Sequence, residues 1–134
     1  MDLILQRWLG AKLRRGWHPL AQPRRVAHTY RRPTGGAILF GEVTLSAEPA
    51  ERFSFSSRAA WPEDAAGDRA ECEEAVLCAV LDELAAGLVP ALGAAVVLES
   101  VGWHPVDSSA QGYYRAARQA AREILSVGTG APNV

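Results

Sequence analysis

The chain has 134 residues, 49% of them hydrophobic, and a formal net charge of -1. This length and composition suit one compact domain with its own core. The longest strongly apolar run, residues 94–98, is far too short to cross a membrane, and the N-terminal residues show no signal-peptide pattern.

The small net charge hides an asymmetry along the chain. Residues 1–32 carry eight basic groups and one acidic group, a balance of +7. Residues 33–134 carry six basic and fourteen acidic groups, a balance of -8, and the two parts sum to -1. A basic block of this kind favours contact with RNA or an acidic partner. Arginines that only solvate a poorly packed arm would give the same pattern.

The first half of the chain predicts a basic arm followed by three strands. Residues 1–22 form the arm, in which apolar residues at helical spacing predict a short helix. Residues 25–32 predict a strand, and the Pro-Thr-Gly-Gly segment 33–36 predicts a turn. Alternating apolar and polar residues predict two further strands, over residues 38–46 and 51–58.

The second half predicts a helix, a strand and a second helix. Over residues 68–86, apolar side chains recur at helical spacing, and a nearly all-apolar run at 94–101 suits a buried strand. Asp107 or Ser108 would cap the last helix, with Ser108 and Gln111 forming a capping box. The apolar face of that helix is expected from these positions: Tyr113, Ala116, Ala117, Ala120, Ile124 and Leu125.

The resulting order is β-β-β-α-β-α, which predicts an α+β two-layer sandwich. Two helices would cover one face of a mostly antiparallel sheet. The domain would span residues 23–126, between the arm at 1–22 and a flexible tail at 127–134.

The segment GWHPVDSS, residues 102–109, holds the residue types of a hydrolytic triad. Members of a triad must meet through space in a fixed hydrogen-bonded chain, which six adjacent residues do not supply. Asp and Ser at this place already serve as helix caps. We therefore expect no catalytic residue and no enzyme activity.

Metal, cofactor and nucleotide sites are not indicated either. No two of the three histidines have the spacing of metal ligands on a helix, and no phosphate-loop motif occurs. Cys72 and Cys78 are six residues apart and would lie on different faces of a helix, so they are not expected to pair. We expect reduced cysteines, a cytoplasmic location, no cofactor and no nucleotide bound by this chain.

Trp103 and His104 are the side chains of the segment most suited to binding. Gly102 permits a tight turn and Pro105 stiffens the chain, so both rings would project from a strand-to-helix corner. A projecting aromatic ring and a histidine can stack on unpaired bases and contact phosphates. The alternative is that Trp103 folds back onto the core.

The block VVLESVGWHPVDSSAQGYYRAARQAAREIL, residues 96–125, resembles the end of domain IV of bacterial translation elongation factor G. In that family a strand leads into His-x-Val-Asp-Ser-Ser and then an Ala-rich helix. The positions matched here are His104, Val106, Asp107, Ser108 and Ser109. Upstream, RRPTGGAILFGEVTL resembles the family's hairpin, with matches at Arg32, Gly35, Gly36, Phe40, Gly41 and Val43. The likeness covers roughly residues 25–126.

The resemblance implies a ribosomal-protein-like fold with an unusual left-handed βαβ crossover. It also implies contact with the ribosome or structured RNA through two loops at an elongated tip. We therefore expect a stand-alone, non-catalytic domain without a GTPase domain. The expected contact residues are His104, Trp103, Gly35 and Gly36, with Arg24, Arg25, Arg31 and Arg32 from the basic block.

This sequence departs from the family pattern at the tip. The first loop carries apolar Ala37, Ile38 and Leu39 where the family has polar residues, and Pro105 follows His104. These changes favour an alternative in which the fold is kept, RNA contact is lost, and the segment from Ala37 to Phe40 binds a protein partner.

Overall fold

The structure is a computed structural model that describes residues 18–86 and 90–128. Most of the predicted arm, including its helix, and most of the predicted tail lie outside these residues. The backbone N–H of His18 donates to the Pro90 carbonyl at 3.0 Å, and that of Leu20 donates to the Gly93 carbonyl at 2.9 Å. The Leu20 side chain is buried. The packed region therefore begins before the predicted boundary at residue 23.

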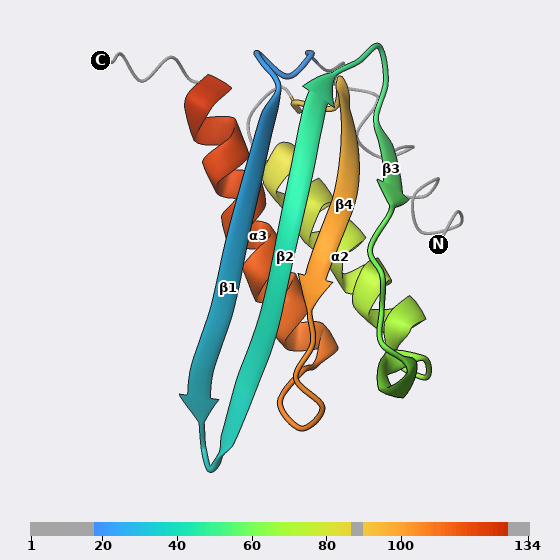
Figure 1. The fold of residues 1–134 in the computed structure, drawn as a ribbon. Helices are drawn as coiled ribbons and strands as arrows, with labels where there is room; N and C mark the ends of the chain where they lie inside the picture. Colours follow the sequence, from blue (N-terminus) through green and yellow to red (C-terminus); the bar gives the residue numbers. More distant parts are fainter. Residues whose placement is uncertain (1–17, 87–89, 129–134) are drawn as a thin grey trace.

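Four strands form one mixed sheet in the order β1-β2-β4-β3. They span Arg24–Thr34 (β1), Ala37–Pro49 (β2), Ser54–Ser57 (β3) and Ala94–Gly102 (β4). β2 pairs antiparallel with β1 and with β4, whereas β3 runs parallel to β4. The long β1–β2 hairpin extends past the helices at one end of the molecule (Figure 1).

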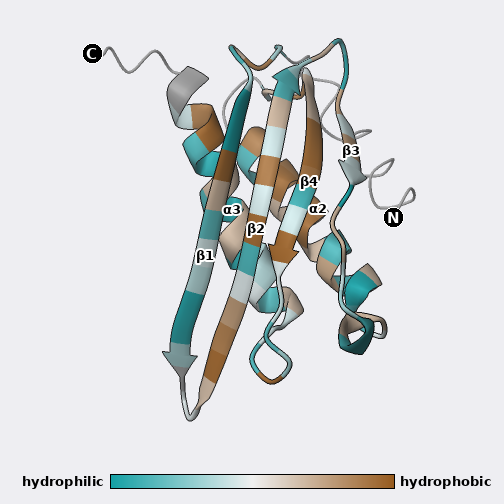
Figure 2. Ribbon diagram, viewed as in Figure 1, coloured by the Kyte–Doolittle hydropathy of each residue, from teal (hydrophilic) through white to brown (hydrophobic). Residues whose placement is uncertain are grey.

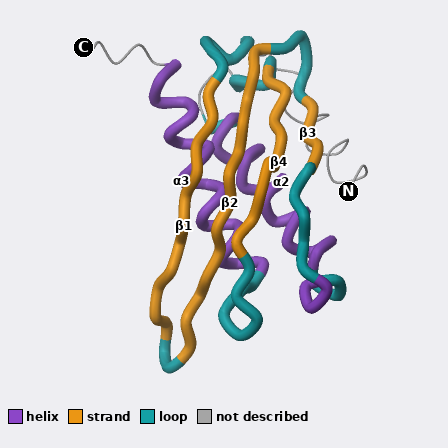
Figure 3. Tube along the Cα trace, in the orientation of Figure 1, coloured by secondary structure: helices purple, strands orange, loops and turns teal. Residues whose placement is uncertain are grey.

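Two helices, α2 (Arg69–Leu84) and α3 (Ala110–Gly128), pack side by side on one face of this sheet (Figures 1 and 3). A short 3-10 turn, η2 (Glu63–Ala65), precedes α2. The predicted β-β-β-α-β-α order and two-layer architecture are confirmed. In the part of the chain that the structure describes, no helix is long and apolar enough to span a membrane.

The connection from β3 through α2 to β4 is left-handed. In Figure 1 both strands point downward, both helices lie behind the sheet, and β4 lies to the left of β3. A chain that descends β3, rises behind the sheet and descends again on the left follows a left-handed path. Parallel strands in one sheet are nearly always joined with the opposite hand, so this crossover is an uncommon feature and matches the expected one.

The core lies between the sheet and the helices. In Figure 2 hydrophobic and less hydrophobic positions alternate along the upper part of β2, as expected when one face of a strand is buried. The helical spacing of α2 and the small-residue face of α3 are confirmed. Buried side chains of these helices include Cys72, Val76, Leu77, Val80, Leu81, Leu84, Tyr113, Ala116, Ala117, Ala120 and Ile124.

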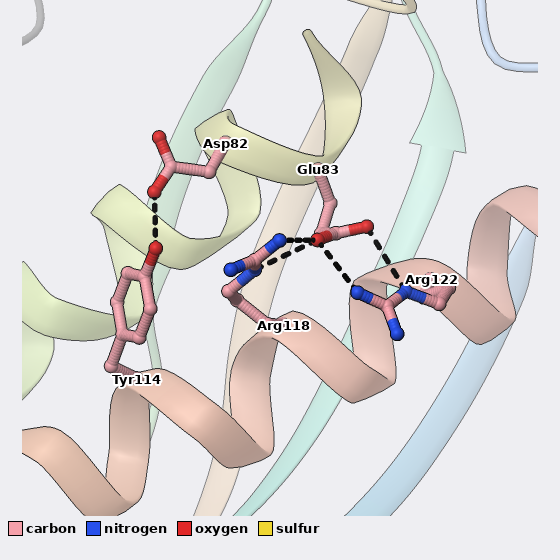
Figure 4. Close-up of polar contacts among 5 residues, drawn as sticks. All are labelled: Asp82, Glu83, Tyr114, Arg118 and Arg122. Atoms are coloured by element: carbon pink, nitrogen blue, oxygen red, sulfur yellow. Dashed lines mark hydrogen bonds and ion pairs between the residues drawn. The ribbon is translucent and has the colours of Figure 1, made fainter. Parts of the chain in front are cut away.

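One buried carboxylate, Glu83 of α2, joins the two helices (Figure 4). Glu83 is 7% exposed. It accepts hydrogen bonds from Arg118 Nε at 2.8 Å and from Arg122 Nε at 3.3 Å. The Nη2 atoms of these arginines lie 2.6 and 3.2 Å from its Oε2. Two charge-assisted contacts thus compensate for burying this carboxylate.

The start of α3 differs from the prediction by one residue. The helix begins at Ala110, and the Ser109 hydroxyl accepts the Gly112 N–H at 3.1 Å, so Ser109 is the capping residue. The Ser108 hydroxyl instead accepts the backbone N–H of His104 at 2.7 Å. The predicted capping box between Ser108 and Gln111 is therefore wrong, because Ser108 is used to close the preceding loop.

Close backbone contact fixes the β1–β2 hairpin against the start of α3. Gly41 of β2 and Gly112 of α3 face each other, and a Cβ atom added to either would overlap the backbone of the opposite element. Glycine is required at this crossing because any side chain would separate strand and helix.

Candidate nucleic-acid interface

Two segments far apart in the sequence meet at one end of the molecule. The first, here called the tip hairpin, comprises residues 31–40, and the second, the tip loop, comprises residues 103–109. The Phe40 N–H donates to the Asp107 carbonyl at 3.2 Å, and the Phe40 carbonyl accepts the Ser109 N–H at 3.4 Å. The rings of Phe40 and His104 lie 6.1 Å apart. The two loops matched by the resemblance therefore form one continuous surface.

The turn of the tip hairpin depends on its two glycines. Gly35 and Gly36 have φ angles of 51° and 88°, in the left-handed region that other residues avoid. Nothing lies within 4 Å of a Cβ atom placed on either residue. The predicted turn is confirmed, and it is open to a partner.

His104 is held by its own loop. Its Nδ1 accepts the Asp107 N–H at 3.2 Å and lies 3.5 Å from Asp107 Oδ2. The His104 side chain is 42% exposed. Within the described residues only Nδ1 of the ring is engaged, so Nε2 can bind an outside partner. A ring with one nitrogen anchored is oriented before it binds.

Trp103 does not project as His104 does. Its ring stacks at 10° on Tyr113, with centroids 6.4 Å apart, and lies 6.1 Å from Trp61. Its Nε1 donates to Asp64 at 3.2 Å. The expectation that both rings project is therefore wrong for Trp103, whose side chain packs against the core as in the alternative interpretation. Trp103 is therefore partly buried.

The hydroxyl groups near the tip loop serve the structure. Ser109 caps α3, Ser108 Oγ accepts the His104 backbone N–H at 2.7 Å, and the hydroxyl oxygens of Ser108 and Tyr113 lie 3.4 Å apart. The Tyr113 hydroxyl also donates to the Gly102 carbonyl. Burial raises the pKa of Tyr113 to about 12. Each residue of triad type thus has a structural partner: Ser109 begins the helix, and His104, Asp107 and Ser108 make contacts within the loop.

The predicted arginines do not gather on one surface. Strand residues alternate between faces, and this divides the four between the two sides of β1. Arg24 and Arg32 lie on the side that faces α3, where Arg24 Nη1 donates to the Glu123 carbonyl at 3.4 Å. Arg25 and Arg31 lie on the open face of the sheet. The basic block therefore supplies two separate surfaces.

Two further features of this end were not predicted. Val106 is the large hydrophobic residue most exposed in the described chain, at 85%, although the Val in the motif was noted only as a match. Arg115, Arg118 and Arg122 of α3 face Arg32 across a groove of about 360 Å³. Their spacing of three and four residues, which puts side chains on one helix face, was a usable signal.

Metal and disulfide sites are absent from residues 18–86 and 90–128. Cys72 and Cys78 have free thiols. Burial, with smaller contributions from nearby carboxylates, raises the pKa of Cys72 to about 11. Burial likewise raises the pKa of Cys78. Both groups are therefore protonated and unreactive at neutral pH.

No protein-family model and no curated protein matches this sequence. Its fold is similar to part of the crystal structure of ttk003000868 from Thermus thermophilus, with a TM-score of 0.70 and 22% sequence identity. The match covers 81% of this chain but only 16% of that protein. The shared feature is thus the fold of one small part of a longer protein.

Proposed function

We propose that this chain is a non-catalytic relative of domain IV of elongation factor G that binds the ribosome or structured RNA through its tip. The observation that carries the proposal is the meeting of the tip hairpin and the tip loop. These two segments hold the dense parts of the resemblance, they lie about 70 residues apart in the sequence, and they form one surface.

The fold supports the same proposal. The β-β-β-α-β-α order and the left-handed crossover are the features that the resemblance implies. The structural similarity to a small part of a longer protein agrees with a domain that also occurs within larger molecules.

His104 is the residue through which the tip would bind RNA. Its Nδ1 is anchored inside the loop, while the other ring nitrogen can donate a hydrogen bond to a phosphate or a base. A hydrogen bond to a charged group contributes about 1.5–3 kcal/mol, so its loss weakens binding roughly tenfold or more.

The test measures cosedimentation with small ribosomal subunits at low and moderate salt. His104→Ala and His104→Asn should both weaken binding about tenfold, because Asn can replace Nδ1 but not Nε2. His104→Gln, which can place a donor near Nε2, should restore part of the affinity. His18→Ala, at the opposite end of β4, is the matched control. Absence of wild-type cosedimentation at low salt would reject the proposal.

A second candidate is a protein-interaction module, favoured by the exposure of Val106 beside the apolar segment from Ala37 to Phe40. An exposed apolar side chain next to partly buried ones is typical of a protein contact. In this case the chain would not cosediment, its mass in solution would rise with concentration, and Val106→Asp would abolish that rise.

A further inference from the structure

Four arginines line a groove between β1 and α3. It is lined by His28, Tyr30, Arg32, Arg115, Arg118, Gln119 and Arg122. β1 descends toward the tip and α3 begins there, so Arg32 and Arg115 lie at the tip end (Figure 1). His28, 3.4 Å from Glu123, lies farther from the tip. The groove therefore continues from the tip surface along the body.

The groove has more positive groups than nearby carboxylates to neutralise them. Four arginines line it, and Glu83 neutralises one charge shared by Arg118 and Arg122. Counting Glu123 as well leaves 4 − 2, a balance of +2 before any charge on His28. In the described chain the guanidinium groups of Arg32 and Arg115 make no hydrogen bond or ion pair. These two guanidinium groups can bind an outside anion.

Glu83 also orients part of the groove. Arg118 and Arg122 each contact it through Nε and Nη2, so each uses two of its five N–H donors. Figure 4 shows both side chains directed from α3 toward this carboxylate. The other N–H groups of these two arginines can still bind a ligand, and the contact with Glu83 already fixes their positions. Binding through such groups loses less side-chain entropy than binding through unanchored arginines.

We propose that this groove binds consecutive phosphates of a single-stranded RNA backbone that continues from the tip. The inference rests on the proposed RNA-binding function. The arginines of α3 span seven residues, or about 10 Å of helix, which is too long for one isolated phosphate group. Planar guanidinium groups bind phosphate oxygens in pairs, and Tyr30 offers a ring on which a base can stack.

An acidic peptide fits this groove less well. Peptides depend on pockets for apolar anchors, and the lining here is charged or polar apart from the ring of Tyr30. RNA needs only the phosphate contacts and a stacking surface, and both are present. The choice between the two can be tested directly.

The test measures fluorescence anisotropy of a labelled, unstructured RNA 12-mer over a range of salt concentrations. The groove variant is Arg32→Gln with Arg115→Gln, and the control is Arg52→Gln with Arg58→Gln, which removes the same charge beside β3, at the opposite edge of the sheet. The groove variant should lose at least tenfold in affinity, and its salt slope should fall by about 1.4, since each phosphate contact contributes about 0.7. The control should change affinity less than threefold.

Two results would overturn the proposal. Equal losses in the two variants would mean that only net charge matters. Polyglutamate that competes with the RNA at the same charge concentration would mean that the occupant is an acidic peptide. Thermal unfolding of both variants within a few degrees of wild type excludes a folding defect.

The design separates this inference from the proposed function. If ribosome binding is absent but binding of the RNA 12-mer is lost in the groove variant, the groove stands and the tip proposal fails. If His104 variants weaken ribosome binding while the groove variant binds the 12-mer normally, the tip proposal stands and the groove inference fails.

Discussion

Glu83 shows how one residue can support both stability and a binding surface. Burial raises its pKa, but hydrogen bonds and charge from Arg122 and Arg118 outweigh this effect, so that the net pKa is lowered. The ionised carboxylate is therefore favoured in the folded protein. A depressed pKa adds stability above the pKa of the unfolded chain and loses it as the pH falls through the folded value.

We predict that Glu83→Gln lowers the free energy of unfolding by about 1–3 kcal/mol at pH 7, a modest loss because both arginines can turn toward water. The difference in free energy of unfolding between wild type and variant should have its largest value above about pH 5. It should shrink as the pH falls below about 4.5. Urea unfolding at several pH values measures both effects. A difference that stays constant down to about pH 3 would contradict the assignment.

At the tip, the sequence indicated which residues matter but not which side chains they contact. The motif indicated Trp103 and His104 together as exposed rings. In the structure Trp103 is held by Trp61 and Asp64, which lie about 40 residues earlier in the sequence. Local spacing cannot show such a partner. His104 was predictable as an accessible ring because its anchor, Asp107, lies within its own loop.

The local sequence pattern predicts most of the helices and strands, but it does not predict the residues at which they begin and end. The periodicity of α2 and α3 predicted which sides are buried, because each helix has one apolar face. β3 is shorter than the predicted strand over residues 51–58, since only Ser54–Ser57 pair with β4. The predicted cap of α3 was Asp107 or Ser108, but the Ser108 hydroxyl binds the His104 N–H and Ser109 caps the helix instead.

The crossing of β2 and α3 gives a prediction for these elements. Gly112→Ala should destabilise the protein by roughly 1–3 kcal/mol, because the added methyl group overlaps the Phe40 carbonyl. Gly67→Ala is the matched control, since nothing lies within 4 Å of the added atom. Chemical denaturation of both variants checks the difference. Equal stability of the two would show that the helix can shift without cost.

Because Phe40 also holds the tip loop, Gly112→Ala should weaken ribosome binding as well, even at temperatures where the variant is fully folded. Gly67→Ala should bind as wild type does. This second measurement distinguishes displacement of the tip from a general loss of stability.

Charge is separated across the whole molecule. β1 and α3 carry arginines along one side, whereas α2, next to the opposite edge of the sheet, carries five acidic groups: Glu71, Glu73, Glu74, Asp82 and Glu83. A polyanion would be steered toward the β1–α3 side. The sequence predicted a basic N-terminal block, but most of the groove's arginines come from α3, in the acidic part of the sequence. Only the fold brings them beside Arg32.

The basic arm can be tested at this scale. Residues 1–17 carry four basic groups against Asp2, a balance of +3. Removing residues 1–17 should weaken RNA binding at low salt and have little effect at high salt, because salt screens the attraction between basic groups and phosphates. The ratio of the RNA affinity of the groove variant to that of the wild type should be the same in the shortened chain as in the full chain. Anisotropy titrations at two salt concentrations measure both quantities.

The glycine crossing has a consequence for inheritance. Positions 41 and 112 are 71 residues apart, yet each occupies the space that a side chain at the other would need. The spacing between strand and helix therefore constrains both positions. In descendants of this chain that keep the fold, we expect the two glycines to be retained together, or to be replaced together when the strand and the helix have moved apart. A homologue with alanine at one position and an unmoved helix would be the exception to explain.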